Sequence, residues 1–437
     1  MKTRLLTLSL ILFGTLAMAQ EKMHISTAII AYEKNEFMEA KKYIDLASDV
    51  ISSKAASDVD DKQMSKFLYY KGEIYFRISQ DTGLSKEVPD ALDKAYNGWT
   101  GLVEYEKKHK QRYTDKVVAK VPYMAQAYLI RGYSKVDAKD YKGAKEDFLR
   151  AYEINKSDMA GELSRIDTST LFNAAIMAEN AKELDQATEL YRKVLDMGYK
   201  GITYSATSVA NGNVVNFASR KSMENAVETG QATDPVIGED TRPDIYLSLF
   251  NVLFTQEKSQ EAMEVLAEGR KLFPNNKKLA QAEVQIYLNN KEYDKALKSL
   301  RNAIRQEPDN KLYYYVMGSI YQQDSVLKNL DSAKVYYKKA IEIDPNYVDA
   351  LYNYGTMMVD EANKVMLEMN NLPLNATSKY NKLNKKKEEI LTESLGYFEK
   401  VYEIDPKDNY NLNALAEVYQ KLGQYEKAMK IKEEMKK

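Results

Sequence analysis

The sequence contains no cysteine, two histidines and one tryptophan among its 437 residues. The absence of cysteine excludes disulfide bonds, thiolate metal sites and the attachment of a lipid anchor through a cysteine. His24 and His109 stand outside any metal-ligand motif, and no HExxH pattern occurs. We therefore interpret both histidines as surface or packing residues, and we expect neither a metal site nor a cofactor.

Sequence motifs that carry catalytic chemistry are also missing. The chain has no GxSxG nucleophile motif, no GxxxxGK[ST] phosphate-binding loop and no GxGxxG dinucleotide motif. Acidic pairs such as Asp60-Asp61 stand in mixed-charge surroundings that are typical of a solvated surface. The sequence therefore predicts a protein that is not an enzyme.

An excess of charge of either sign is absent as well. The 63 Lys and Arg residues nearly balance the 64 Asp and Glu residues, which gives a net charge of −1. Such a balance supplies no overall field for nucleic acid, so we expect no nucleic-acid partner. Lys385-Lys386-Lys387 is followed directly by Glu388-Glu389, and we interpret this run as a solvated helix face rather than an anion site.

The apolar run at the start of the chain is too short to cross a bilayer. Leu5 to Leu16 is mostly apolar, follows Lys2 and Arg4, and precedes Ala17-Met18-Ala19. A spanning helix needs about 20 apolar residues, whereas a charged start, a short apolar core and a small-x-small site are typical of a secretory signal peptide. We expect cleavage after Ala19, a periplasmic or outer-membrane-associated location in a Gram-negative bacterium, and no transmembrane segment.

The sequence contains several copies of one pattern, a ladder of small and large residues at helical spacing. One copy reads Ala296, Leu300, Ala303 and Pro308, and Tyr314, Met317, Gly318 and Tyr321 follow it. A proline ends a helix, and a small residue that faces large ones lets two helices pack closely. The ladder recurs as Ala262-Leu266-Gly269-Pro274, Ala333-Tyr337-Ala340-Pro345 and Ser394-Phe398-Val401-Pro406.

Pro274 and Pro308 are 34 residues apart. This period and this pattern resemble the tetratricopeptide-repeat (TPR) family. The resemblance covers most of residues 24–435 and implies an all-α fold, a TPR α-solenoid of antiparallel helix hairpins wound in a right-handed superhelix. It also implies a concave groove that is lined by the first helix of each hairpin and binds a protein or peptide partner.

The domain organisation follows from where the ladder is regular and where it stops. We expect a signal peptide over 1–19, TPR-like hairpins over 20–197, a non-repeat insert over 198–242 and a C-terminal TPR block over 243–437. Within the insert, β-prone runs flank Asn211-Gly212, which favours a β-hairpin. The insert's β structure is predicted to lie between 202 and 219 alone.

One hairpin of the C-terminal block is unusually long. The interval from Gly355 to Ser394 exceeds the regular spacing by 27 residues, and apolar residues continue at helical spacing through the excess. The sequence therefore predicts an extended helical hairpin over 348–405, with an arm over 359–393 that projects beyond its neighbours.

The register implied by the family places polar and aromatic residues along the groove. They are Asn251, Gln285, Tyr315, Ser319, Tyr352, Asn353, Thr356, Asn413 and Glu417. Some TPR proteins hold a terminal carboxylate with a lysine, but Gln281, Tyr315, Tyr352 and Asn413 occupy the corresponding positions here. Binding of that kind is therefore not expected.

Three functional hypotheses remain. The first is an exported scaffold or adaptor that binds other proteins of the cell envelope, with peripheral envelope association left open. The second is an outer-membrane-associated, glycan-binding protein of the helical SusD-like kind. The missing anchor cysteine and the lone Trp99, which we assign to packing, count against it. The third is an enzyme, for which no residues remain to form a catalytic domain.

The mature protein, isolated from its native host, should begin near Gln20, because residues 1–19 have the organisation of a signal peptide. N-terminal sequencing of that material tests the expectation. An N-terminus at Met1 would contradict it.

Overall fold

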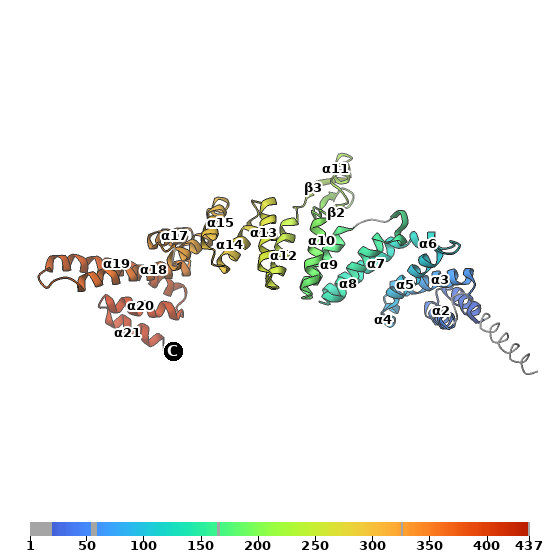
Figure 1. The fold of residues 1–437 in the computed structure, drawn as a ribbon, viewed down its shortest axis with the longest axis horizontal. Coiled ribbons are helices and arrows are strands. Elements are labelled where there is room, and N and C mark those ends of the chain that lie inside the picture. Colours follow the sequence, from blue (N-terminus) through green and yellow to red (C-terminus); the bar gives the residue numbers. More distant parts are fainter. Residues whose placement is uncertain (1–19, 54–58, 164–166, 325–326, 436–437) are drawn as a thin grey trace, which may run out of the picture. The chain divides into compact units, whose positions relative to one another are not determined.

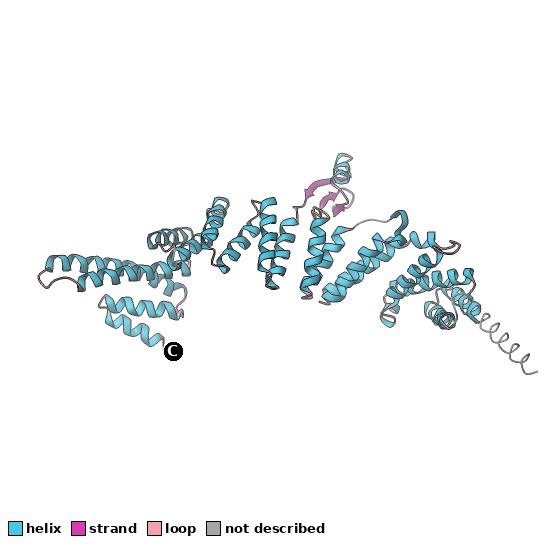
Figure 2. Ribbon diagram, in the orientation of Figure 1, coloured by secondary structure: helices cyan, strands magenta, loops and turns pink. Residues whose placement is uncertain are grey.

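The computed structural model describes residues 20–53, 59–163, 167–324 and 327–435. The predicted signal peptide lies outside the described residues. The described chain is predominantly helical, with one small sheet (Figure 2). It divides into two compact units, Met1–Ala262 and Met263–Lys437, and the division falls within helix α13 (Ser259–Leu272). This division into compact units does not show where each repeat begins or ends. The domain limits that we expect from the sequence therefore remain predictions.

Antiparallel helix pairs build the first unit (Figure 1). Its hairpins are the helix over 20–33 with α2 (Phe37–Ser52), α3 (Asp61–Gln80) with α5 (Ala91–Glu106), α7 (Val121–Asp137) with α8 (Tyr141–Lys156), and α9 (Thr168–Asn180) with α10 (Leu184–Asp196). The connections contain α4 (Leu84–Glu87), α6 (Thr114–Val118) and the 3₁₀ segment η2 (Asp158–Leu163), and α12 (Arg242–Thr255) packs on α10.

The second unit continues the same architecture after α13. Its packed pairs are α14 (Lys277–Asn289) with α15 (Tyr293–Gln306), α16 (Lys311–Gln323) with α17 (Leu330–Ile343), α18 (Val348–Asn370) with α19 (Thr377–Ile404), and α20 (Asn409–Lys421) with α21 (Tyr425–Glu434). The all-α hairpin fold predicted from the sequence is confirmed.

Close contacts between a small residue and an aromatic ring hold the hairpins together. A Cβ atom placed on Gly318 in α16 would lie 2.8 Å from the ring of Tyr337 in α17. The same contact joins Gly72 to Trp99, Gly132 to Phe148 and Gly355 to Phe398. The pattern of small and large residues in the sequence therefore marks real helix contacts, and Trp99 is fully buried as expected.

Most of the turns between paired helices have the same backbone geometry. A residue with positive φ closes the first helix, and Glu257 and Lys291 occupy this place with φ values of 60° and 57°. Asn35, Lys139 and Lys182 do the same with φ of 61°, and Gly423 with φ of 74°. This left-handed conformation ends a helix and lets the chain reverse at once.

The insert contains more β structure than the sequence predicted. β1 (Tyr204–Ser208) pairs antiparallel with β2 (Val214–Phe217), as expected, but it also pairs with β3 (Ala232–Ile237). The restriction of β structure to 202–219 was therefore wrong. Pro235 lies within β3, and it is tolerated there because β3 is an edge strand, where a missing N–H need not break a pairing.

A short helix completes the insert. Ala206 of β1 and Ala232 of β3 form a small core with Met223 and Ala226 of α11 (Arg220–Glu228). This core is separate from those of the hairpins, which supports the interpretation of the segment as an insertion between repeats.

Two long helices occupy the segment that the sequence predicted to be an extended hairpin. α18 has 23 residues and α19 has 28, against 10 to 14 in the other helices of α14–α21. Ala362, Val365 and Met369 continue the buried side of α18 into the extension. Within the described residues, no helix combines the length and apolar character that a membrane span needs.

Gly318→Leu should lower the free energy of unfolding of the second unit by about 1–3 kcal/mol, because the side chain must displace the Tyr337 ring. Urea unfolding followed by circular dichroism measures this. Gly396→Leu is the matched control, because nothing lies within 4 Å of a Cβ at this position of α19. Leucine there should leave stability unchanged or raise it, since glycine is a poor helix former. Equal losses in both variants would contradict the packing role of Gly318.

Candidate functional site

The nine groove residues predicted from the sequence all lie on first helices of hairpins. Asn251 is on α12 in the first unit. The others belong to the second unit: Gln285 on α14, Tyr315 and Ser319 on α16, Tyr352, Asn353 and Thr356 on α18, and Asn413 and Glu417 on α20.

Three of these residues meet around the hydroxyl of a tyrosine on α17. Asn353 Nδ2 donates to the Tyr315 hydroxyl oxygen at 3.3 Å and to that of Tyr337 at 3.4 Å. Tyr337 in turn donates to Gln322 Oε1 at 2.7 Å, and Ser319 also hydrogen-bonds with Tyr337. We call Tyr315, Ser319, Gln322, Tyr337 and Asn353 the Tyr315 cluster.

Aromatic packing fixes the position of Tyr315. Its ring lies 5.7 Å from that of Tyr337 and 5.3 Å from that of Tyr347, centroid to centroid. Burial raises the pKa of the Tyr315 and Tyr337 hydroxyls above their ordinary value, and it raises the pKa of Tyr347 to about 12. These hydroxyls therefore stay protonated at neutral pH, so the cluster offers uncharged donors and acceptors on a rigid support.

A cleft of about 700 Å³ borders the Tyr315 cluster, between α16, α17 and α18. Gln322 and Asn353 of the cluster line it, and Met357 adds an apolar side chain. Charged residues of both signs also line the cleft: Lys328, Asp331, Lys334, Asp360, Glu361 and Lys364. Because Lys334 forms an ion pair with Glu361, the cleft has no strong preference for one sign of charge.

The remaining predicted residues make mostly local contacts. The Tyr352 ring packs edge-on against Phe398 at 5.9 Å, and its pKa is raised by burial and by the nearby charges of Asp408 and Glu417. Tyr352 and Glu417 are thus neighbours across α18 and α20. The others bond within their own helices: Gln285 to Asn289, Thr356 to Asn353, Asn413 to Asn409 and Glu417 to Lys421, while Thr255 donates to the Asn251 carbonyl.

Sequence reasoning missed Tyr337, Gln322 and Tyr347 as members of this surface. The sequence analysis named Tyr337 only as a large residue of the repeated ladder. A signal was available, since tyrosine outnumbers phenylalanine by 34 to 11 in this chain. A tyrosine at a packing position carries a hydroxyl that needs a partner.

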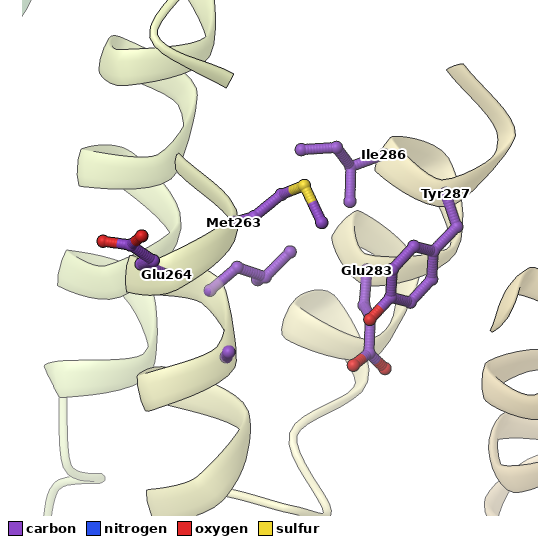
Figure 3. Close-up of a pocket in the computed structure, with 7 residues that line it drawn as sticks. Met263, Glu264, Glu283, Ile286 and Tyr287 are labelled. Atoms are coloured by element: carbon purple, nitrogen blue, oxygen red, sulfur yellow. The ribbon is translucent and has the colours of Figure 1, made fainter. Parts of the chain in front are cut away.

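A smaller pocket of about 220 Å³ lies between α13 and α14 (Figure 3). Met263 and Ile286 point toward one another across it, whereas Glu264 points away from α14. Glu283, on the α14 side, lies 3.4 Å from Arg270 Nε. A pocket of this size admits little more than one side chain, and its carboxylate is already paired, so we assign it no chemistry.

The first unit contains a buried ionic network that is satisfied internally. Arg131 donates to both carboxylate oxygens of Asp147, at 2.7 and 2.9 Å, and to those of Asp93, both at 3.0 Å. Burial alone would raise the pKa of Asp93, but the hydrogen bonds from Arg131 and Tyr128 hold it below its ordinary value. Asp147 is only 2% exposed. This network therefore stabilises the packing of α5, α7 and α8, and it offers no free catalytic group.

Among the residues that the structure describes, no group of three or more His, Asp or Glu side chains is arranged to hold a metal ion. The rings of His24 and His109 stack on Tyr43 and Tyr105, respectively.

Family models of the tetratricopeptide repeat match several parts of the chain. One covers residues 253–320, a second covers 336–371, and a third matches 125–158, 313–347 and 411–433. These segments coincide with the helix hairpins of both units and exclude the insert. No curated protein matches the sequence.

Solved structures give distant likenesses. The C-terminal part of a TPR repeat-containing protein from Cytophaga hutchinsonii is 14% identical and covers 73% of this chain and 95% of its own, with a TM-score of 0.44. YrrB, described as a TPR protein with an unusual peptide-binding site, is 16% identical and covers 55% and 97%, with a TM-score of 0.35. A tetratricopeptide repeat protein from Parabacteroides merdae is 16% identical and covers 61% and 78%, with a TM-score of 0.36.

Tyr337→Phe should lower the free energy of unfolding by about 1 kcal/mol, because the hydrogen bonds of one hydroxyl to Gln322 and Asn353 are lost while the ring packing stays. Tyr336→Phe, on the same helix, is the matched control. Its ring stacks on Tyr321 at 5.6 Å, and its hydroxyl makes no hydrogen bond within the described residues. Chemical unfolding measures the stability of both variants, and only Tyr337→Phe should be less stable than the wild type. Equal stabilities of the two variants would show that the Tyr337 hydroxyl is not part of a cluster.

Proposed function

Because the chain belongs to the tetratricopeptide-repeat family, we propose that it is a non-catalytic scaffold of the cell envelope that binds an extended segment of a partner protein. The Tyr315 cluster and the cleft beside it are the proposed binding surface. Export to the periplasm or the outer membrane is part of the proposal, and the organisation of residues 1–19 supports it.

The observation that carries the proposal is the arrangement of the Tyr315 cluster. Hydroxyl and amide groups on two successive first helices converge at one place, and Tyr315, Ser319 and Asn353 are partly exposed. An extended peptide presents backbone N–H and C=O groups that need such partners. Tyrosine supplies contact area at a low entropic cost because its side chain has few rotatable bonds.

The mixed charge of the cleft favours a protein partner. Its lysines and carboxylates lie on α17, on α18 and in the loop before α17, so they can pair with side chains of either sign on both sides of a bound segment. The volume of about 700 Å³ suits several residues of a peptide. The partner's specificity would follow from these charges, while the cluster would hold its backbone.

The burial of Trp99 counts against the glycan-binding alternative. Sugar rings stack on exposed aromatic platforms, and the lone tryptophan, Trp99, is 0% exposed beneath Gly72. The charges of Arg131, Asp93 and Asp147 in the first unit pair with one another, so they give no support to an enzyme. The scaffold hypothesis therefore has the stronger support.

Affinity capture from an envelope extract of the native host, with the full mature chain as bait, tests the proposal. The double variant Tyr315→Phe and Ser319→Ala removes two hydroxyls but keeps the ring and the helix. It should weaken the captured partner's affinity about tenfold or more, which is typical when central contacts of an interface are lost. The double variant also loses hydrogen bonds within the Tyr315 cluster, so circular dichroism should first show that it is folded at the temperature of the binding measurement.

Tyr123→Phe combined with Tyr425→Phe is the matched control, because it removes two hydroxyls from side chains that are each 63% exposed and lie elsewhere. This control should bind as the wild type does. Capture of no partner would contradict the scaffold role. If shortening the 359–393 arm abolished binding while the Tyr315 and Ser319 variant bound normally, the Tyr315 cluster would not be the binding surface.

A further inference from the structure

The extended hairpin ends in a free turn. Residues 371–376 connect α18 to α19, which run side by side (Figure 1). We call residues 366–387 the arm tip. The arm tip combines exposed large apolar side chains with an excess of lysine.

Three large side chains are exposed at the same level of the arm tip. Leu374, in the turn, is 105% exposed, which is as much as in an extended peptide. Leu367 is 60% exposed three residues before the end of α18, and Tyr380 is 46% exposed three residues after the start of α19. At 1.5 Å per residue, both lie about 5 Å from the turn. Exposed apolar groups that gather in this way mark an interaction site.

The charge of the arm tip is strongly positive. Residues 366–387 contain five lysines, one glutamate, and no aspartate or arginine. Lys379 pairs with that glutamate, Glu368, at 3.1 Å. Lys382 and Lys386 are exposed and form no ion pair within the described residues. The run Lys385-Lys386-Lys387 was expected to be a solvated face, and it is only partly neutralised, by Glu389 at 3.8 Å from Lys385.

We propose that the arm tip binds the surface of an anionic lipid bilayer. Leu374 enters the boundary between headgroups and acyl chains, with Leu367 and Tyr380 beside it. Amphipathic elements reach about 5–10 Å into this region. Lys379, Lys382 and Lys386 lie on one side of α19, between about 3 and 14 Å along the helix from its start. Lys382 and Lys386 lie farther from the turn than Tyr380 does, and they therefore stand toward the phosphate groups.

The chemistry of the arm tip favours a lipid surface over a protein groove. Its positive charges are all lysines, which attract a charged surface as flexible point charges, whereas arginine dominates specific protein contacts. Lysine is also depleted at the centre of protein interfaces. The end of two helices and a turn is small compared with the roughly 800 Å² that each partner of a stable complex contributes. A bilayer needs no such matched surface.

Co-sedimentation of the full mature chain with vesicles tests this directly. Vesicles of phosphatidylglycerol and phosphatidylethanolamine in equal parts should bind the protein, and phosphatidylcholine vesicles should bind it much less. Leu374→Ser should weaken binding about tenfold or more, because one buried leucine side chain is lost. Changing Lys379, Lys382 and Lys386 to Gln together should weaken it about a hundredfold and remove most of its salt dependence.

Matched controls lie elsewhere in the second unit. Leu312→Ser changes a leucine that is 48% exposed on α16, and changing Lys338, Lys407 and Lys430 to Gln removes the same charge from exposed positions. Both controls should bind as the wild type does. Circular dichroism should show that all variants are folded, which is expected because every altered side chain is exposed.

A second readout reports on insertion. Leu374→Trp places an indole at the turn, and its fluorescence should shift to the blue with anionic vesicles, against a constant background from the buried Trp99. The proposal is overturned if the wild type does not bind anionic vesicles, if the control and arm-tip variants lose binding equally, or if no blue shift occurs. Capture of a protein that depends on Leu374 without vesicle binding would assign the arm tip to a protein groove instead.

Discussion

The contact between a small residue on one helix and an aromatic ring on its partner is the interaction on which the hairpins depend. Gly318 against Tyr337 and Gly355 against Phe398 bring the two helices of a pair so close that a Cβ atom would not fit. In a repeat architecture each hairpin touches only its neighbours, so this local contact has to be made anew in each pair. It also decides where the second helix places its polar atoms.

The Tyr315 cluster is a consequence of that packing. Tyr337 fills the space that Gly318 leaves, and its hydroxyl extends beyond the contact to meet Gln322 and Asn353. A phenylalanine would satisfy the packing equally well. The tyrosine therefore places a polar hydroxyl at a packing position, so one side chain contributes both to the stability of the hairpin and to the hydrogen bonds of the Tyr315 cluster.

The two departures from regular repeats, the insert and the extended hairpin, are built differently. The insert has its own small core around Ala206 and Met223, so it adds a separate element. The extended hairpin lengthens an existing core, since Ala362 and Val365 continue the buried side of α18. That core ends before the turn, so Leu374 packs against no other part of the described chain. Its side chain is therefore available for the lipid surface that we propose.

The sequence by itself determined the features that depend on local spacing: the all-α hairpins, the insert, the turn at Asn211-Gly212 and the long arm. Helix periodicity, prolines and the small-large ladder are properties of neighbouring residues, so they can be recognised without a structure. Only the tertiary structure decided the rest. Asn353 meets Tyr315 across 38 residues and β1 meets β3 across a helix. Such pairings, like the exposure of Leu374, depend on how separate elements pack, and no local pattern specifies that.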